Sequence, residues 1–317
     1  MSTAAGTRPD RTVADRTTTS EEPGVTTTAE TLPSAPAESV PTGAGTAPLV
    51  RRGRGRQRLT DALLPAGVFL ALLGIWYAIT YLVLDEDRRF LMPAPHTIVT
   101  DALLDPATME KVAEGLWRSV VVTFVGLAIA IVIGLAWAIA MSQSRMVERS
   151  LFPYAVALQC IPMLALVTLI GFWFDYGFSS RVIVCVMISL FPVVSNSLFG
   201  LQSVDRGMHE LFDLHGAGRG TRLLKLQLPA AMPAIFAGFR ISAGLSVVGA
   251  IVGDLFFRKG DPGLGILLSN FSSRLQGPEL FLTIIVAAAL GFAVFALFGW
   301  VGRLAVGRWY DQSRDAG

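Results

Sequence analysis

The sequence predicts an all-α integral membrane protein with six transmembrane helices. Of the 317 residues, 52% are hydrophobic and only 16% are charged, whereas about a quarter of the residues of a soluble protein are charged. Mean hydropathy is +0.55. Six segments also reach the roughly 20 apolar residues that a bilayer core requires. These spans are expected at about 63–84, 120–141, 151–174, 182–201, 233–257 and 281–301.

The first 50 residues have a different composition. Threonine, alanine, proline and serine dominate them, without apolar periodicity. Such a segment buries too little surface to offset the entropy of ordering it, so we expect residues 1–50 to form a disordered tail. No apolar core follows the first basic residues, which argues against a signal peptide. We expect a basic cytoplasmic segment over 51–62 and a transmembrane domain over 63–317.

Basic residues predict how the chain is oriented. Five arginines in residues 51–58 precede the first span, and loops rich in Lys and Arg stay in the cytoplasm. With six spans, the loops of the same face carry fourteen Lys and Arg, against eight on the opposite face. We therefore expect a multi-pass protein of the cell membrane with both termini and the loop 202–232 in the cytoplasm.

The loop 202–232 contains a short amphipathic pattern. Met208, Leu211, Phe212 and His215 recur at helical spacing and form one apolar stripe. Gly216 follows where a helix C-cap glycine belongs. An apolar stripe in a loop between spans has little use unless another protein docks there. We therefore expect a cytoplasmic partner at this helix.

A second short helix is expected further along this loop. Thr221 is in place to cap it, and Pro229 is expected to stop it.

Two outer segments have their own patterns. A surface helix is expected around 96–105, and the segment 258–280, with Gly263-Leu264-Gly265, is expected to be re-entrant or interfacial. Between the third and fourth spans, Asp175 and Arg181 are interpreted as surface charges.

Four residues within the spans are candidates for the translocation pathway or its gate. Pro162 lies in the third span, where it marks either a hinge or a tolerated kink. Asn196 can hydrogen-bond across helices, and Gly249 belongs to a GxxxG pattern that also favours close helix packing. Asp254, near the outer end of the fifth span, faces either a cavity or a structural partner.

No enzyme chemistry is visible in the sequence. It contains no HExxH, no GxSxG and no Walker A loop, so any ATP hydrolysis takes place on another chain. Cys160 and Cys185 have neither CxxC nor metal spacing, and a net charge of +2 shows no nucleic-acid footprint. An ion-coupled carrier would show several ionisable groups at mid-membrane, and a scaffold would not need kinked, glycine-rich spans. Both remain alternatives.

Motifs in consistent order carry a resemblance over residues 90–310. The cytoplasmic loop places Glu210, Leu211-Phe212, Gly216 and Leu226-Gln227-Leu228-Pro229 in the order of a signature that begins Glu-Ala-Ala and ends Ile-x-Leu-Pro. The chain thereby resembles permease subunits of ATP-binding-cassette (ABC) importers of the nitrate, sulfonate and taurine type. Leu211-Phe212 is bulkier than the usual Ala-Ala. The other matching segments are Met92–Pro95, Ile161-Pro162, Trp173-Phe174 and Gly263-Leu264-Gly265.

The resemblance implies a type I importer fold with a cytoplasmic coupling helix. It implies as partners a second permease copy, two cytoplasmic ATP-binding subunits and an extracytoplasmic solute-binding protein, besides membrane lipid and without nucleic acid. ATP and Mg would bind the partner ATPase, and no cofactor would bind this chain. The implied coupling residues are Met208, Glu210, Leu211, Phe212, Asp213, Gly216, Ala217, Leu228 and Pro229.

The cargo expected from the resemblance is a small organic solute. The sulfonate, taurine and nitrate class is the first expectation, and a pyrimidine precursor of thiamine or riboflavin is the alternative. Selectivity is expected to reside in the binding protein.

Overall fold

A computed structural model describes residues 54–310 of the chain. The tail expected over 1–50 and the first residues of the basic segment lie outside this range. Within it, every regular element is a helix, so the expected all-α membrane fold is confirmed. Contacts divide the chain into two units, Met1–Gln57 and Arg58–Gly317. All contacts described below lie in the second unit.

The helices follow one another with short connections. In chain order they are α1 (Arg54–Ala78), η1 (Ile79–Val83), η2 (Glu86–Leu91), α2 (Pro95–Thr97), η3 (Ile98–Leu103), α3 (Pro106–Ser142), α4 (Arg145–Cys160), α5 (Met163–Phe174), α6 (Phe178–Gln202), α7 (Arg206–Leu214), α8 (Arg219–Arg222), η4 (Leu223–Gln227), α9 (Leu228–Phe256), α10 (Leu264–Ser273) and α11 (Gly277–Tyr310). Five helical segments are long and apolar enough to cross a membrane, and a bent pair makes a sixth.

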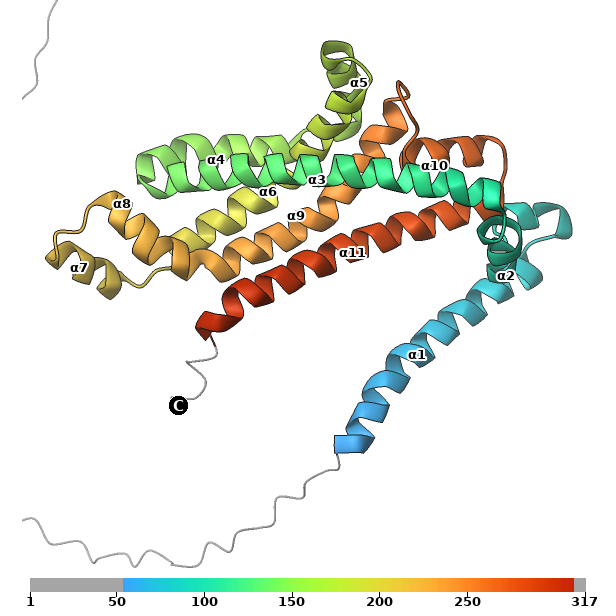
Figure 1. Ribbon diagram of the computed structural model, residues 1–317, viewed down its shortest axis with the longest axis horizontal. Coiled ribbons are helices and arrows are strands. Elements are labelled where there is room, and N and C mark those ends of the chain that lie inside the picture. The colour runs from blue at the N-terminus through green and yellow to red at the C-terminus, as the bar shows by residue number, and fades with distance from the viewer. Residues whose placement is uncertain (1–53, 311–317) are drawn as a thin grey trace, which may run out of the picture. The chain divides into compact units, whose positions relative to one another are not determined.

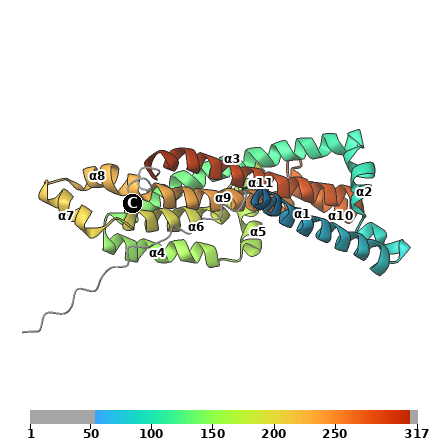
Figure 2. The same cartoon turned by 90° about the horizontal axis from the view of Figure 1, so that it is seen from below.

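Four long helices, α3, α6, α9 and α11, run side by side (Figures 1 and 2). The closest packing joins α6 to α9, where small residues let the backbones approach. A Cβ on Gly249 would lie 2.7 Å from Cα of Cys185, and one on Gly253 would lie 3.1 Å from Cα of Arg181. Close helix contacts of this kind stabilise membrane bundles through van der Waals packing. The short helices α7 and α8 lie at one end of the bundle, and α10 lies at the other (Figure 1).

The segment 151–174, expected as one span with a hinge or a kink at Pro162, is broken there into two helices. Its two parts, α4 and α5, meet at 97°, and Figure 1 shows α5 turning away from the bundle. The cause is Pro162, because a proline pushes the preceding residue out of the helical region. Ile161 accordingly has an extended backbone, with ψ at 128°.

Pro229 does not stop a helix, contrary to the sequence expectation. Residues Arg219–Phe256 form one continuous helical run through α8, η4 and α9. The π-helical turn η4 ends two residues before the proline, and Leu228 N, between them, donates to the Leu223 carbonyl five residues back. This wider turn lets the helix pass through the proline. Thr221 lies inside α8, whose N-cap is Gly218 without a side-chain cap.

The first span has few neighbours among the described residues. Its outer end is tied to the following loop: Trp76 Nε1 donates to the Pro93 carbonyl at 3.1 Å, and Thr80 Oγ1 to the Met92 carbonyl at 3.2 Å. Most apolar side chains further back along the helix are exposed. Beyond that loop, α2 and η3 form the helix expected at 96–105, with Ile98 and Ala102 buried in the core.

Candidate functional site

The helix α7 carries the predicted coupling stripe. Asp205 caps it, accepting a hydrogen bond from Gly207 N at 2.7 Å, as a short side chain at an N-cap typically does. Met208 and Leu211 are 44% and 45% exposed, and Leu214 is 85% exposed. Phe212 is half-buried. The apolar face of α7 is therefore available for docking on this chain.

The turn after α7 is built around a glycine. Gly216 has φ +64°, which is a left-handed conformation that glycine adopts without steric cost. Its N–H bonds the Asp213 carbonyl at 2.9 Å, and Ala217 N bonds the Phe212 carbonyl at 3.0 Å. Asp213 also forms an ion pair with Arg222 of α8. The turn thereby ties α7 to the helical run that continues into the membrane.

Glu210 and the signature residues beyond the turn have different surroundings. Glu210 is exposed on the polar side of α7. Leu228 and Pro229 do not contribute to the α7 surface, because they line an apolar cavity beside α11. The structure therefore brings Met208 to Ala217 together in one helix and turn, and places Leu228-Pro229 in a separate location.

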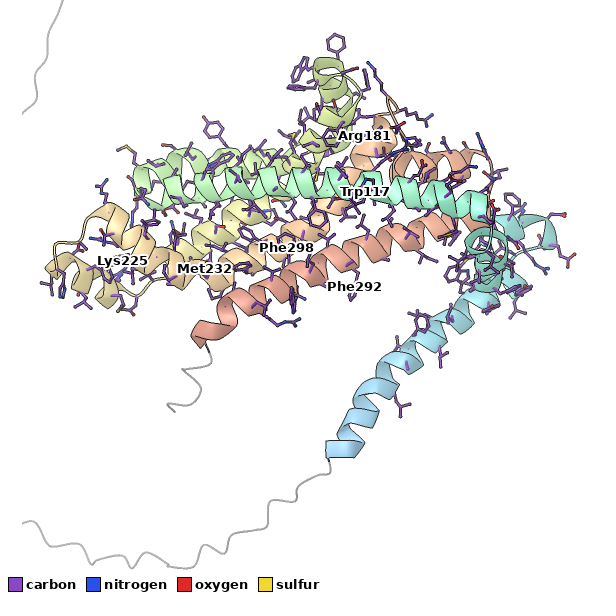
Figure 3. The ribbon with its side chains drawn as sticks, viewed as in Figure 1. Trp117, Arg181, Lys225, Met232, Phe292 and Phe298 are labelled. Carbon is purple, nitrogen blue, oxygen red and sulfur yellow. The ribbon has the colours of Figure 1, made fainter. Side chains whose placement is uncertain are left out.

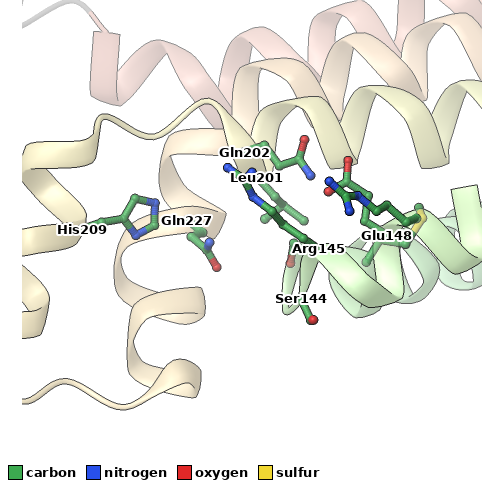
Figure 4. A pocket seen from close by; sticks show the side chains of 10 residues that line it. Ser144, Arg145, Glu148, Leu201, Gln202, His209 and Gln227 are labelled. Atoms are coloured by element: carbon green, nitrogen blue, oxygen red, sulfur yellow. The ribbon is translucent and has the colours of Figure 1, made fainter. Parts of the chain in front are cut away.

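The opposite face of α7 borders a polar cavity of about 540 Å³ (Figure 4). His209 reaches it from α7 and Gln227 from η4. Arg145, Glu148 and Arg149 line it from the first turns of α4. This cavity was not expected from the sequence. His209 follows Met208 of the apolar stripe directly and therefore lies on another face of α7. This position is the sequence signal that could have indicated the cavity.

At the other end of the bundle, a buried ion pair joins α6 to α9. Arg181 of α6 is 5% exposed and Asp254 of α9 is 2% exposed. Their Nη1 and Oδ1 atoms lie 3.0 Å apart. Figure 3 shows Arg181 at the end of the bundle that carries α10. The interpretation of Arg181 as a surface charge is therefore wrong, because α9 and the loop after it enclose the guanidinium.

Arg181 also holds the loop between α9 and α10. Its Nη2 donates to the carbonyls of Phe257 at 2.9 Å and Lys259 at 3.0 Å, and its Nη1 to that of Asp261 at 3.1 Å. A planar guanidinium presents several donors in fixed directions, which suits this kind of multiple contact. One side chain from α6 therefore fixes a loop that follows it by more than seventy residues.

Asp254 completes this cluster by capping α10 from another helix. Its two oxygens accept from Gly263 N at 3.2 Å and from Ile266 N at 2.9 Å. Ser119 of α3 accepts from Leu264 N at 3.0 Å. The free N–H groups of a helix start are satisfied in this way. We call Ser119, Arg181, Asp254 and the α10 start the outer clamp, after the face on which the distribution of Lys and Arg is expected to place it.

The glycines of Gly263-Leu264-Gly265 make this approach possible. A Cβ on Gly263 would lie 2.7 Å from Oδ2 of Asp254, and a Cβ on Gly265 would lie 2.3 Å from the Ile251 carbonyl. Only glycine fits at these distances. The expected re-entrant segment 258–280 contains α10, and Leu264, Leu267 and Phe271 of that helix are buried within the bundle.

A second, exposed ion pair lies beside the outer clamp. Lys259 Nζ contacts Asp175 Oδ2 at 2.7 Å and Oδ1 at 2.9 Å. The hydrogen bond from Lys259 holds the pKa of Asp175 below its usual value, and the backbone N–H of Tyr176 adds to this effect. Asp175 therefore does lie at the surface, as expected from the sequence.

The remaining pathway candidates occupy different environments. Pro162 is exposed at the bend between α4 and α5. Asn196 Nδ2 donates to the Pro192 carbonyl of its own helix at 2.9 Å, and a Cβ on Gly238 would lie 2.8 Å from Cβ of Asn196. Gly249 is buried at the α6–α9 contact. The structure thus brings Asn196 and Gly249 into helix packing, apart from Pro162.

The fold and these two ends define a class of protein: a multi-span helical membrane protein with a short, exposed amphipathic helix at one end of its bundle. Residues 118–309 match the family model described as "Binding-protein-dependent transport system inner membrane component". This match covers more than half of the chain, so the chain belongs to that family and is a permease subunit of an ABC importer. It has no catalytic role of its own, and the ATPase is a separate chain.

Three relatives show how far the similarity extends. The formylaminopyrimidine transport permease protein ThiX of Halalkalibacterium halodurans is 31% identical over 76% of this chain and 93% of the relative. The riboflavin transport system permease protein RibX of Chloroflexus aurantiacus is 33% identical over 52% of this chain and 60% of the relative. The putative aliphatic sulfonates transport permease protein SsuC of Bacillus subtilis is 27% identical over 76% of this chain and 86% of the relative.

Proposed function

We propose that α7 is the coupling helix through which a cytoplasmic ATP-binding subunit drives this permease. The observation that carries the proposal is the exposure of two residues of the predicted stripe, Met208 and Leu211, on a capped, glycine-terminated helix, with Leu214 exposed beside them. Burying such side chains in a groove contributes about 1.5–3 kcal/mol each. Beyond α7, the helical run Arg219–Phe256 leads from the turn into the membrane.

The driving force comes from the partner subunits in this proposal. ATP and Mg bind two cytoplasmic ATPase subunits, and no cofactor binds this chain. Nucleotide biases the transport cycle only by favouring one arrangement of the complex over the other. The larger number of Lys and Arg in the loops of that face supports a cytoplasmic position for α7 and both termini. An extracytoplasmic solute-binding protein then meets the end that carries α10.

A homodimer is the assembly that we propose. The apolar side chains of α5 are its main support: Leu164, Phe172, Trp173 and Phe174 are exposed on a helix that turns away from the bundle (Figure 1). Apolar side chains on a membrane helix are covered either by lipid or by another helix. A second copy of the permease would cover α5 and enclose a pathway that one copy leaves open.

For the cargo, we propose a heteroaromatic vitamin precursor ahead of a small sulfonate. Fixed positive charge is scarce inside the described spans, since Arg181 is paired with Asp254 and Arg240 stacks on Phe295. An anionic cargo would be expected to meet an unpaired cation. Over the same 76% of this chain, the relative named for formylaminopyrimidine is 31% identical and SsuC of Bacillus subtilis is 27% identical. The similarity to the latter over 76% of the chain keeps a sulfonate as the second candidate.

Two variants of α7 test the coupling proposal. Glu210→Lys reverses a charge on the polar side of the helix, and Gly216→Pro cannot adopt the positive φ of that position. In proteoliposomes holding the full complex, we expect both to abolish ATP-driven uptake while membrane insertion is unchanged. Gly220→Ala is the control, because its added Cβ has no neighbour within 4 Å. Normal uptake by both variants would contradict the proposal.

The cargo is tested on the partner binding protein. We expect formylaminopyrimidine or a related pyrimidine to raise its thermal unfolding midpoint in a screen that includes riboflavin, taurine, alkanesulfonates and nitrate. Stabilisation by sulfonates alone would reverse the order of the two candidates.

A further inference from the structure

The polar cavity of about 540 Å³ lies between α7 and the end of the bundle (Figure 4). The ends of α3 and α6, the start of α4, α7 and η4 all contribute to its lining. Met141 and Leu201 are the apolar residues of the described lining, and both are buried. Small-molecule sites are cavities of roughly 300–1,000 Å³ in which a few polar groups fix the ligand. The cavity therefore has room for a small polar molecule.

The start of α4 concentrates positive charge at this cavity. Arg145 and Arg149 lie four residues apart in its first turns, so they share one side of the helix. Like charges at this spacing repel each other, and cations are disfavoured at the positive N-terminal end of a helix. None of the ion pairs among residues 54–310 involves either arginine. An anion bound by both would offset these two unfavourable effects.

Neither membrane topology nor docking at α7 accounts for this arrangement. The positive-inside rule requires Lys and Arg on one face of the membrane but sets no spacing between them. His209 borders the cavity from another face of α7 than the one that carries Met208 and Leu211. A partner that covers the apolar stripe therefore does not need to enter the cavity.

Uncharged and acidic groups complete the lining. Gln202 reaches the cavity from α6, His209 from α7 and Gln227 from η4. Figure 4 shows Arg145 between His209 and Glu148. Glu148 is half-buried and is the one carboxylate among the described lining residues. Since amide and imidazole N–H groups donate hydrogen bonds and a carboxylate accepts them, the lining combines donors for an anion with an acceptor for hydroxyl groups.

We propose that this cavity binds a small, soluble phosphate monoester that carries hydroxyl groups, such as a polyol or sugar phosphate. Arg145 and Arg149 bind the phosphate through charge-assisted hydrogen bonds, to which the planar guanidinium group is well suited. Glu148 accepts hydrogen bonds from the hydroxyl groups. The bound ligand connects α4 with α7 and η4, so it stabilises the position of α7 against the bundle.

Isothermal titration calorimetry and thermal unfolding of the full-length permease in detergent test the proposal, with glycerol 3-phosphate as the probe at constant ionic strength. We expect saturable binding and a higher unfolding midpoint. Arg145→Gln/Arg149→Gln should bind the probe roughly tenfold or more weakly, because it removes charge-assisted hydrogen bonds. The matched control Arg206→Gln/Arg219→Gln removes two exposed arginines of the same loop that do not line the cavity, and it should bind normally.

The acidic residue and the shape of the cavity are tested separately. The wild type should bind glycerol 3-phosphate more tightly than inorganic phosphate, and Glu148→Gln should reduce this preference. Gln202→Phe keeps every charge but narrows the cavity from an exposed position on α6. It should weaken binding of glycerol 3-phosphate.

Four results would overturn the proposal. They are the absence of saturable binding to the wild type, equal weakening in the control pair, normal binding by Gln202→Phe, and stabilisation by dioleoylphosphatidylglycerol without any by glycerol 3-phosphate. The last result would assign the arginines to a lipid headgroup. None of these readouts uses cargo, ATP or the ATP-binding subunit, so their failure is distinct from failure of the coupling proposal.

Discussion

The two ends of the bundle are built on opposite principles. At the outer clamp, most polar atoms of the buried charges have partners within the subunit: Arg181 contacts Asp254 and three backbone carbonyls through Nη1 and Nη2, while its Nε has no hydrogen-bond partner among the described residues, and Asp254 contacts two backbone N–H groups. At α7, apolar side chains remain exposed and the helix is tied to the chain by a glycine turn and one ion pair. The buried charges at the first end are paired within the subunit. The apolar side chains at the second end would be buried only by the docking partner that we propose.

Breaking the buried pair should have the largest effect. Asp254→Asn leaves the Arg181 charge buried without its counter-ion, and breaking such a pair costs about 3–5 kcal/mol. We expect a large drop in the thermal unfolding midpoint of the purified permease. Arg181→Met should be similarly harmful, and Asp254→Asn/Arg181→Met less harmful than the two losses added together. Additive losses would show that the two side chains act independently.

Removing the stripe on α7 should affect assembly and leave folding intact. In Met208→Ser/Leu211→Ser, about 1.5–3 kcal/mol of burial per side chain is lost from the complex, which corresponds to at least a tenfold weaker affinity for the ATP-binding subunit. Co-purification and a titration with that subunit measure this loss. Unchanged affinity would show that α7 does not dock through this face.

Gly265→Ala should place the outer clamp under strain. The new Cβ would lie 2.3 Å from the Ile251 carbonyl and 2.7 Å from Leu255 N, so α10 must move away from α9. Overpacking of this kind costs about 1–3 kcal/mol. Gly218→Ala, where nothing lies within 4 Å, is the matched control at the other end. A thermal midpoint equal to that of the wild type would mean that α10 shifts without cost.

The smallest effect is expected at the exposed pair of Asp175 and Lys259. Because the pKa of Asp175 is lowered in the folded state, its contribution is present above the ordinary value of about 3.9 and is lost as pH falls through the folded value. Lys259→Gln should therefore cause a slight destabilisation at pH 7 that disappears in strong acid. The measurement is the difference in thermal unfolding midpoint between the wild type and Lys259→Gln, followed from pH 7 into acid. A difference that grows in acid would contradict this prediction.

Hydropathy was enough to locate the membrane segments because length and apolar content decide which segments cross a bilayer. It was not enough to locate their breaks. Pro162 and Pro229 are both prolines in or beside apolar runs, yet Pro162 breaks its helix and Pro229 does not. The difference lies in the π-turn η4, which depends on how the surrounding chain packs.

The candidate sites also differ in how much of them the sequence revealed. The α7 stripe and its glycine turn are local features, so spacing along the sequence revealed them. The Arg181–Asp254 pair joins residues that are distant in sequence, and the sequence alone suggested a surface position for the arginine. Two opposite charges beside the outer ends of different spans were the only hint that they meet.

The continuous helical run from Arg219 to Phe256 mechanically connects the turn after α7 to the outer clamp. Its 38 residues span about 57 Å at 1.5 Å per residue, with the turn after α7 at one tip and Asp254 two residues from the other. A tilt of roughly 5° at the first tip would carry the second by about 5 Å if the rod stays stiff. If α7 is the coupling helix, as we propose, a small movement of the turn after α7 is transmitted to the residues that hold α10 in place.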